Sequence, residues 1–510
     1  MSKLVIALVL STALHAFQNA ASIGGQVLNS ADDEPVNGVV LVLTAAASAS
    51  TPLKFVTETR GLFLFENLAP GRYVLLAESE GFARQVFGSR GNPLAGITLT
   101  LAPGQEMNDL EFNLIRGSTI SGKVLDAAGN PVRKATALAL QPIYRRGSRE
   151  YVPIRSAASD ENGAYRLANL GPGIYLLSAA ARGGEGIATF YPNSADIANA
   201  AAVTVGPGGA AAGTDIRMLK AQTFRVAGKL AAENVPAAIA WLTRKGAGAT
   251  ALATRMAATI DSDGSFDFPN VPPGTYLLTA TEQDGVAPAS APLNVAVTAK
   301  DVEGIVLKPQ SSGELTGTIS MSAADVPLPK GMQVVLEAAD TLIPRPPRAA
   351  VGDDGKFTLK NLAAGRYIVH MQMPESLYVR SVRYRGLDVT ENGFEFGGGV
   401  PALLLISLSA SGAVVEGRVR GADGFPMPGA VVALVPSVRR YSRYKEATTD
   451  QYGAFTFAGV PPGEYKIYSW DQIETGAYQN AEWLKQYELK GRSIVAKQDG
   501  HETMALRAIE

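Results

Sequence analysis

Histidine, cysteine and clustered carboxylates are the residues that most often carry out hydrolysis or bind metals, and this chain has few of them. It contains three His and no Cys, whereas hydrolysis generally needs a metal, a Ser–His pair or paired carboxylates. His15 lies in an apolar N-terminal stretch, which leaves His370 and His501. His501 and Glu502 begin like a zinc-protease motif, but Ala505 stands where the second ligand is required. The sequence therefore predicts no catalytic residue, no metal site and no cofactor.

Aspartates recur just before a Gly at several places along the chain. A calcium site needs several oxygen ligands, whereas Asp is common in turns because its carboxylate accepts hydrogen bonds from its own backbone. One or two carboxylates at each place are too few for calcium, so we interpret them as turn residues. They are Asp160, Asp261, Asp263, Asp353, Asp354 and Asp450.

Basic and aromatic residues gather in the stretch before two of these turns. Arg forks and Tyr rings suit an acidic polysaccharide or a carboxylate-bearing protein partner, whereas Arg stems also cover neighbouring strands in solvated hairpins. Both interpretations stay open. If the second stretch is a strand, Arg439, Tyr441 and Arg443 share one of its faces. The candidate binding residues are Arg145, Arg146 and Tyr151, with Tyr144 and Arg149 beside them, and Arg439, Tyr441, Arg443 and Tyr444, with Arg440 and Lys445 beside them.

A second aromatic group lies near the C-terminus. Trp470 and Trp483, with Tyr478 and Tyr487 nearby, are further candidate binding residues because aromatic rings stack on sugars. Aromatic residues this dense also close the core of a terminal domain. The sequence alone leaves both uses open.

The strands and turns that must position these groups are predicted from a repeated sequence pattern. Five stretches of equal length share the pattern Gly, x, aromatic, x, apolar, followed by a turn and a Tyr. The copies are roughly 100 residues apart, which is the size of a domain and too long for a solenoid repeat. The repeated tyrosines are Tyr73, Tyr175, Tyr276, Tyr367 and Tyr465.

The second copy shows how each repeat is expected to fold. Tyr165 and Leu167 point to one face of a strand, which is the core face, because strand side chains alternate. Pro172 and Gly173 suit the two central positions of a type II turn. Tyr175 then begins another strand, and its hydroxyl is placed to bond backbone as in a tyrosine corner.

A second element precedes each copy, with the pattern apolar, x, Gly, x, apolar, and in four copies a Pro follows. These are predicted first strands, at residues 23–27, 120–124, 226–230, 315–319 and 415–419. The two elements together resemble the carboxypeptidase regulatory-like domain, a transthyretin-like member of the carbohydrate-binding-like β-sandwich group. The resemblance implies a Greek-key sandwich that is separate from the zinc domain of carboxypeptidases.

The predicted fold is therefore all-β, a tandem array of five Greek-key β-sandwich modules of transthyretin-like or Ig-like type. An N-terminal Lys3, an apolar run at residues 4–14 and small residues beyond it predict a signal peptide. The expected division is a signal peptide at 1–21, segment 1 at 22–117, segment 2 at 118–221, segment 3 at 222–311, segment 4 at 312–411 and segment 5 at 412–510.

Charge and composition narrow the expected function. The formal net charge of −1 gives no general drive toward nucleic acid, and no later stretch is apolar enough to span a membrane. We expect an exported, non-catalytic scaffold or adhesion protein of the periplasm or cell surface. The alternative is a carbohydrate-binding protein. A cell-surface polysaccharide or an envelope protein is the expected partner, and the sequence predicts no oligomeric state.

Overall fold

The computed structural model describes most of the chain after its N-terminal stretch. The described residues are 20–45, 51–89, 96–181, 187–220, 222–232, 237–245, 255–282, 289–309, 313–323, 326–338, 346–397 and 403–510. The predicted signal peptide lies outside them apart from residues 20 and 21, as do the predicted boundaries at Ala221 and Ser311. No helix among the described residues is long and apolar enough to cross a membrane.

Segment 1 shows the arrangement of strands that the other segments repeat. Its first strand, β1 (Ala21–Asn29), lies between β4 (Leu62–Leu68), which is antiparallel, and β8 (Glu106–Leu114), which is parallel. A second sheet covers the inner face of this one. It contains β2 (Val40–Ala45), β3 (Leu53–Val56), β5 (Gly71–Glu78), β6 (Gln85–Val86) and β7 (Leu99–Leu101).

Segments 2 and 3 follow the same plan. Segment 2 contains β9 (Ser118–Leu125), β12 (Ala164–Leu170), β16 (Ala210–Ala211) and β17 (Ile216–Arg217) around its first strand, and β10 (Thr136–Arg145), β11 (Ser148–Ala158), β13 (Gly173–Ala180), β14 (Thr189–Phe190) and β15 (Ala202–Val205) in its second sheet. The first sheet of segment 3 contains β18 (Phe224–Leu230), β21 (Ser265–Val271) and β24 (Val302–Leu307). Its second sheet contains β19 (Ala238–Arg244), β20 (Met256–Ile260), β22 (Gly274–Glu282) and β23 (Leu293–Val297).

Segments 4 and 5 follow the same plan and contain additional elements. The first sheet of segment 4 contains β25 (Gly313–Met321), β28 (Lys356–Leu362), β30 (Tyr378–Tyr384), β31 (Leu387–Asp388) and β33 (Leu403–Ser409). Its second sheet contains β26 (Gln333–Ala338), β27 (Arg348–Ala350), β29 (Gly365–Gln372) and β32 (Phe394–Phe396). The first sheet of segment 5 contains β34 (Ala413–Arg420), β37 (Ala454–Val460) and β40 (His501–Arg507). Its second sheet contains β35 (Val431–Pro436), β36 (Lys445–Thr448), β38 (Gly463–Trp470) and β39 (Arg492–Ala496), and helix α3 (Ala481–Lys485) precedes β39. Short 3-10 turns are η1 (Thr59–Gly61), η3 (Ile197–Asn199), η5 (Tyr441–Arg443), η6 (Ala477–Gln479) and η7 (Glu488–Lys490).

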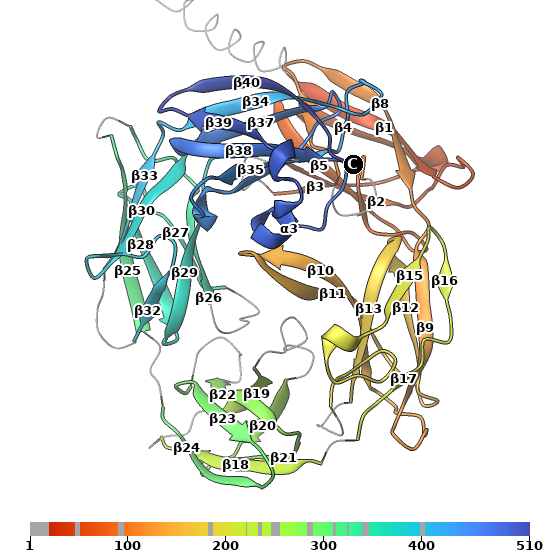
Figure 1. Cartoon of the computed structure of the whole chain (residues 1–510), viewed down its shortest axis with the longest axis vertical. Helices are drawn as coiled ribbons and strands as arrows, with labels where there is room; N and C mark the ends of the chain where they lie inside the picture. Colours follow the sequence, from red (N-terminus) through yellow and green to blue (C-terminus); the bar gives the residue numbers. More distant parts are fainter. Residues whose placement is uncertain are drawn as a thin grey trace, which may run out of the picture.

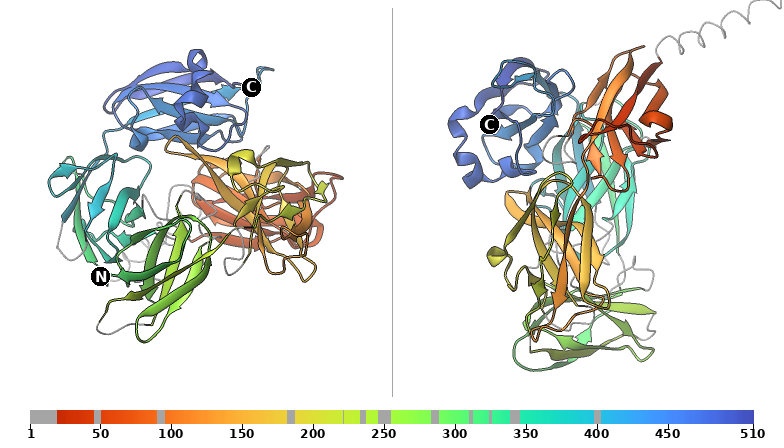
Figure 2. Two further views of the ribbon diagram at one scale, coloured as in Figure 1. Left: turned by 60° about the horizontal axis from the view of Figure 1, so that its bottom comes forward. Right: turned by 90° about the vertical axis from the view of Figure 1, so that its right-hand side faces the viewer.

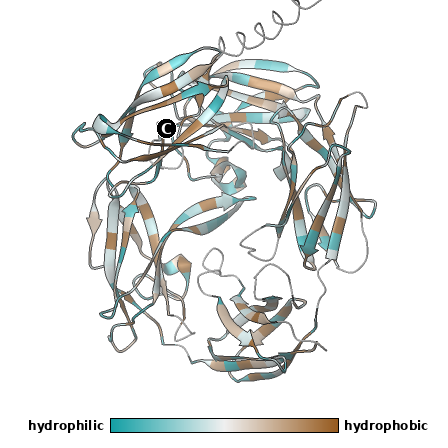
Figure 3. Ribbon diagram, turned by 180° about the vertical axis from the view of Figure 1, so that it is seen from behind, coloured by the Kyte–Doolittle hydropathy of each residue, from teal (hydrophilic) through white to brown (hydrophobic). Residues whose placement is uncertain are grey.

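The predicted all-β fold of tandem β-sandwiches is confirmed. Apolar and polar residues alternate along many of the strands (Figure 3), because one face of each sheet meets the partner sheet. The count of five modules and their boundaries stay a prediction. Figure 1 shows the segments following one another around a closed course, and Figure 2 shows the same arrangement from two further sides.

The Gly in each first strand is explained by the parallel strand beside it. A side chain at Gly25 would collide with the carbonyl of Leu110 in β8, and one at Gly417 would collide with that of Met504 in β40. Gly therefore allows the last strand of the sheet to approach the first.

The five repeated tyrosines form the predicted tyrosine corners. In segment 2, the hydroxyl of Tyr175 donates a hydrogen bond of 2.8 Å to the carbonyl of Gly171, four residues upstream, and the side chain is 1% exposed. The same bond joins Tyr73 to Ala69, Tyr276 to Pro272, Tyr367 to Ala363 and Tyr465 to Pro461. Each corner ties the turn before a core strand to that strand.

The prediction of a type II turn at Pro-Gly is wrong. Gly71 and Gly173 have φ of 157° and 153°, far from the value near +80° that a type II turn needs. The left-handed residue lies earlier, at Asn67 and Asn169, both with φ of 57°. There the pairing with the first strand shifts by a bulge, and it resumes beyond the bulge at Leu68 and Leu170.

The predicted Asp turns are present. The carboxylate of Asp450 accepts hydrogen bonds of 2.9 Å from the backbone N–H groups of Tyr452 and Ala454. Asp160 makes the equivalent pair of bonds in segment 2. These two aspartates therefore hold the turns that lead into the Gly-aromatic strands of segments 2 and 5.

Candidate functional site

The predicted binding residues of segment 2 lie on a hairpin that reaches toward segments 4 and 5 (Figure 1). Arg145 lies 3.4 Å from the carboxylate of Glu337 in segment 4. Arg146 donates to the carbonyl of Glu391, and its guanidinium stands 5.2 Å from the ring centroid of Tyr441 in segment 5. These two arginines are therefore already engaged inside the molecule.

The third candidate on this hairpin, Tyr151, serves its own segment. Its ring lies 5.4 Å from the guanidinium of Arg149, and it packs against a small cluster of Leu138, Leu140 and Phe190. Arg149 in turn pairs with Glu474 of segment 5 through two hydrogen bonds of 3.2 and 2.7 Å. The ring of Tyr151 therefore supports the arginine that makes the contact with segment 5.

The candidates of segment 5 do not lie on a strand, so the predicted shared face of Arg439, Tyr441 and Arg443 is wrong. Strand β35 ends at Pro436, which has no N–H to continue the pairing. A 3-10 turn then covers Tyr441–Arg443. It is closed by a hydrogen bond of 3.0 Å from the N–H of Arg443 to the carbonyl of Arg440.

The two ends of this turn differ in what they contact. Arg439 and Arg440 are exposed. The side chain of Arg443 is half-buried and donates to the carbonyl of Pro462 at 3.2 Å, so it covers the turn before the tyrosine corner. Tyr441 stacks on Tyr444 with ring centroids 5.9 Å apart, and burial raises the pKa of Tyr444.

The C-terminal tryptophans lie in and around a second hydrophobic cluster of segment 5. Trp470 is 1% exposed and stacks on Tyr468 at 5.3 Å. Trp483 on α3 covers it at 5.7 Å, and Tyr487 lies beside both rings. The interpretation that these aromatics close the core of a terminal domain therefore describes Trp470, whose ring faces are not open to a sugar.

The structure brings together candidates that the sequence separates by about 300 residues. Arg146 of segment 2 meets Tyr441 of segment 5, and the acidic partners Glu337, Glu391 and Glu474 lie around them. Sequence reasoning missed all three glutamates. They belong to neither repeated element, and no pattern marks them.

Electrostatics at this meeting point favour ionised Glu337. A hydrogen bond of 2.7 Å to His370, with added attraction from Arg145 and Arg146, lowers the pKa of Glu337 although partial burial opposes the shift. Glu391 also accepts a hydrogen bond from the hydroxyl of Ser442 in segment 5. Segments 2, 4 and 5 therefore share one network of charged groups.

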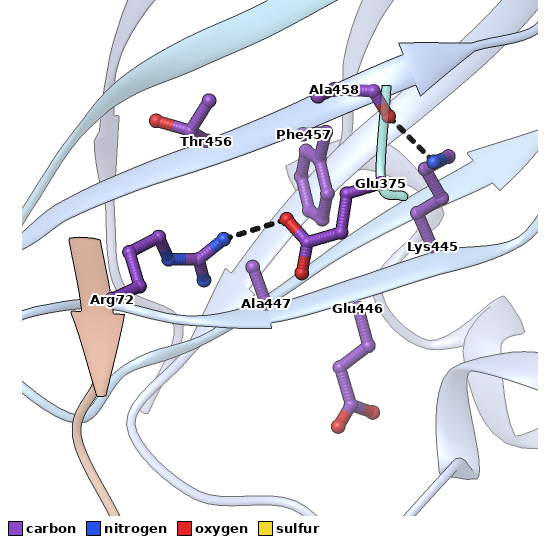
Figure 4. Close-up of a pocket in the computed structure, with 8 residues that line it drawn as sticks. All are labelled: Arg72, Glu375, Lys445, Glu446, Ala447, Thr456, Phe457 and Ala458. Carbon is purple, nitrogen blue, oxygen red and sulfur yellow. Dashed lines mark hydrogen bonds and ion pairs between the residues drawn. The ribbon is translucent and has the colours of Figure 1, made fainter. Parts of the chain in front are cut away.

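A cavity of about 220 Å³, lined by both charged and apolar residues, lies where segments 1, 4 and 5 meet. Figure 4 shows Arg72 of segment 1 paired at 2.9 Å with Glu375 of segment 4. Lys445 of segment 5 donates to the carbonyl of Ala458 at 2.6 Å, and burial lowers the pKa of this lysine. The sequence analysis names Lys445 only as a neighbour of the candidate binding residues and does not predict this cavity.

The two histidines that remained as candidates both pair with glutamate. Besides the bond of His370 to Glu337, His501 lies 2.9 Å from Glu416 on the neighbouring strand. Within the described residues, no group of three or more His, Asp or Glu side chains is placed to hold a metal.

Two regions of the chain match a known domain family. The carboxypeptidase regulatory-like domain matches residues 22–114 and 414–472, which lie in segments 1 and 5. These two regions are therefore similar to that domain. The comparison with curated proteins finds no relative of this chain.

Several solved structures match parts of this chain at low identity and low TM-score. The Bacillus anthracis TIE protein is 11% identical, with 76% of this chain and 72% of that chain covered and a TM-score of 0.17. A streptococcal ancillary pilin is 11% identical, with coverage of 56% and 99% and a TM-score of 0.19. Two B repeat units of the collagen-binding protein of Staphylococcus aureus are 12% identical, with coverage of 77% and 100% and a TM-score of 0.14. At these identities and TM-scores, nothing about partners or function is carried over.

Proposed function

We propose that this chain is an exported, non-catalytic scaffold or adhesion protein whose β-sandwiches are held in one closed arrangement. The observation that carries the proposal is the joining of segments remote in sequence, above all the hairpin of segment 2 on segments 4 and 5. A string of independent domains presents its surfaces in many relative orientations. A closed arrangement presents them in one, which lowers the entropy lost when a partner is bound.

Further contacts support a closed scaffold. Gln451 of segment 5 exchanges two hydrogen bonds, of 3.1 and 2.9 Å, with the backbone of Thr100 in segment 1. Arg72 and Glu375 join segments 1 and 4. The family match at both ends of the chain supports a non-catalytic role, because the resemblance implies a domain separate from the zinc domain of carboxypeptidases.

Small-angle X-ray scattering of the purified mature chain tests the arrangement. We expect a scattering curve that fits the closed course of Figure 1. A curve typical of an extended string of domains would contradict the proposal. Hydrolysis of any polysaccharide or peptide by the purified chain would contradict the non-catalytic part.

Binding of an acidic polysaccharide is the second candidate function, and the exposed Arg439 and Arg440 beside Tyr441 favour it. A pull-down on immobilised polygalacturonate tests it. We expect retention that falls with salt, because exposed charges are screened within about 10 Å at 0.1 M. The R439A/R440A variant should be retained less than an R133A/R217A variant, which loses the same charge elsewhere. Equal retention of the two variants would contradict this site.

A further inference from the structure

The hairpin of segment 2 extends well beyond the sheet that it starts from. Strand β10 pairs with β13 only through Thr136–Leu140, whereas its pairing with β11 continues to Arg145 and Ser148. The tip is a two-residue turn at Arg146 and Gly147, with φ of 48° and 77°, as a tight hairpin requires. We call residues 141–152 the arm.

The arm docks through its backbone as well as its charges. The N–H of Tyr144 donates to the carbonyl of Thr475 at 2.7 Å, and the N–H of Arg146 donates to the side chain of Gln479 at 2.9 Å. Asn480 donates to the carbonyl of Gly147 at 2.8 Å. With the ion pair between Arg149 and Glu474, these bonds define a binding site for the arm on segment 5 and the adjoining edge of segment 4. We call this site the receptor.

The docking is polar, so it can be undone without unfolding a core. Each hydrophobic cluster of the described residues falls within one segment. Arg149 and Glu474 keep 45% and 38% of their side-chain surface exposed, and exposed ion pairs are weak and screened by salt. An undocked arm would leave the strands of segment 2 paired.

The chain between the arm and its receptor runs through segment 3. Charged residues of this segment pair internally, as Arg225 does with Asp267 and Glu303 and Lys229 does with Asp263. Figure 1 shows segment 3 at the bottom of the molecule and the docked arm near its middle. The arm and its receptor are thus two complementary surfaces on one chain, joined by a separately packed segment.

We propose that the receptor on segments 4 and 5 also accepts the arm of a second copy of this chain, so that two chains exchange arms. Exchange of an identical element between two copies is a low-cost route to a dimer, because the contacts are those already made within one chain. Docking within the chain has the advantage of a high effective concentration. The exchanged form is therefore favoured when docking within the chain is blocked.

Two charge-reversed variants block docking within each chain but permit it between chains. The arm variant carries R145E and R149E, and the receptor variant carries E337R and E474R. In either variant alone, like charges meet when the arm docks. In an equimolar mixture, the reversed arm meets the reversed receptor, and the native arm of the second chain meets the native receptor of the first.

Hydrogen exchange of the peptide that contains Tyr144 and Arg146 reports docking, because both N–H groups donate across the contact. Each variant alone should be monomeric with these amides unprotected. The mixture should double in mass by analytical ultracentrifugation and regain the protection. A chain with all four substitutions is the control, and it should be a monomer with a protected arm.

Three results would overturn the proposal. A mixture that stays monomeric shows that the receptor does not accept a second copy. Protected amides in either variant alone show that these charges do not hold the arm. An unprotected arm in the four-substitution control shows that charge complementarity does not determine docking.

Discussion

At the scale of single residues, each repeated tyrosine has two roles that mutagenesis can separate. The ring of Tyr175 fills the core of segment 2, and its hydroxyl bonds the carbonyl of Gly171. Tyr175→Ala should lower the free energy of unfolding by about 3 kcal/mol or more, because a large buried aromatic is lost. Tyr175→Phe should cost only about 1 kcal/mol, the value of one hydrogen bond.

Unfolding in denaturant, monitored by hydrogen exchange of segment 2, measures the change in the free energy of unfolding for both variants. Ile174→Ala on the same strand is the matched control, because Ile174 is 60% exposed and surface changes stay within about 0.5 kcal/mol. Equal effects of Tyr175→Ala and Ile174→Ala would show that the corner does not support the core.

The same tyrosine predicts a loss of stability at alkaline pH. Burial raises the pKa of Tyr175 from 10.0 to about 12, so the unfolded chain loses its phenolic proton at a lower pH than the folded chain does. The free energy of unfolding should therefore fall as pH rises between 10 and about 12. Tyr175→Phe should make this fall shallower, and an unchanged slope would contradict the assignment.

At the scale of elements, neighbouring arginines in the turn after β35 have different roles. Arg443 bonds the carbonyl of Pro462 and is half-buried, whereas Arg440 is exposed. Arg443→Ala should cost about 1 kcal/mol of stability, and Arg440→Ala should stay within about 0.5 kcal/mol. Thermal unfolding of the two variants checks this.

The arm should also respond to acid through Glu337. Its pKa is lowered from 4.5 in the folded chain, first by the hydrogen bond to His370 and then by the arginines of the arm. The bond to His370 lies within segment 4, so only the attraction from Arg145 and Arg146 links the ionised carboxylate to docking. Protonation of Glu337 removes this attraction, so the docked arm should lose that part of its stability as pH falls below 4.5 through the lowered pKa. Amide protection at Tyr144 should decrease over this range.

Glu337→Gln provides the comparison for this acid response. The variant should show weaker protection at neutral pH and a smaller change on acidification, because it has no carboxylate to protonate. A response equal to that of the native chain would assign the acid effect to another group.

At the scale of the whole molecule, the segments should fold independently. Each contains a hydrophobic cluster of its own, and a domain of roughly 100 residues can bury a sufficient core. A fragment of residues 118–221 should therefore give the circular dichroism of a folded β-protein and a cooperative thermal transition. An unfolded fragment would show that segment 2 depends on its neighbours.

The sequence by itself determined the features that depend on nearby residues. The repeat, the first strands, the tyrosine corners and the Asp turns all appeared where alternation and turn chemistry placed them, because each involves residues close together in the chain. Local reasoning failed where the backbone had two options. Asn67 rather than Gly71 took the left-handed conformation, and the stretch after Pro436 formed a turn rather than a strand.

Only the tertiary structure decided how the segments meet. Arg146 and Tyr441 lie in different segments, so their contact depends on the relative orientation of whole domains. Glu391 of a third segment bonds both Arg146 and Ser442. The burial of Trp470 depends likewise on how α3 folds back over its own segment. Polar contacts of this kind leave no periodic pattern, because no alternation of apolar residues is needed to form them.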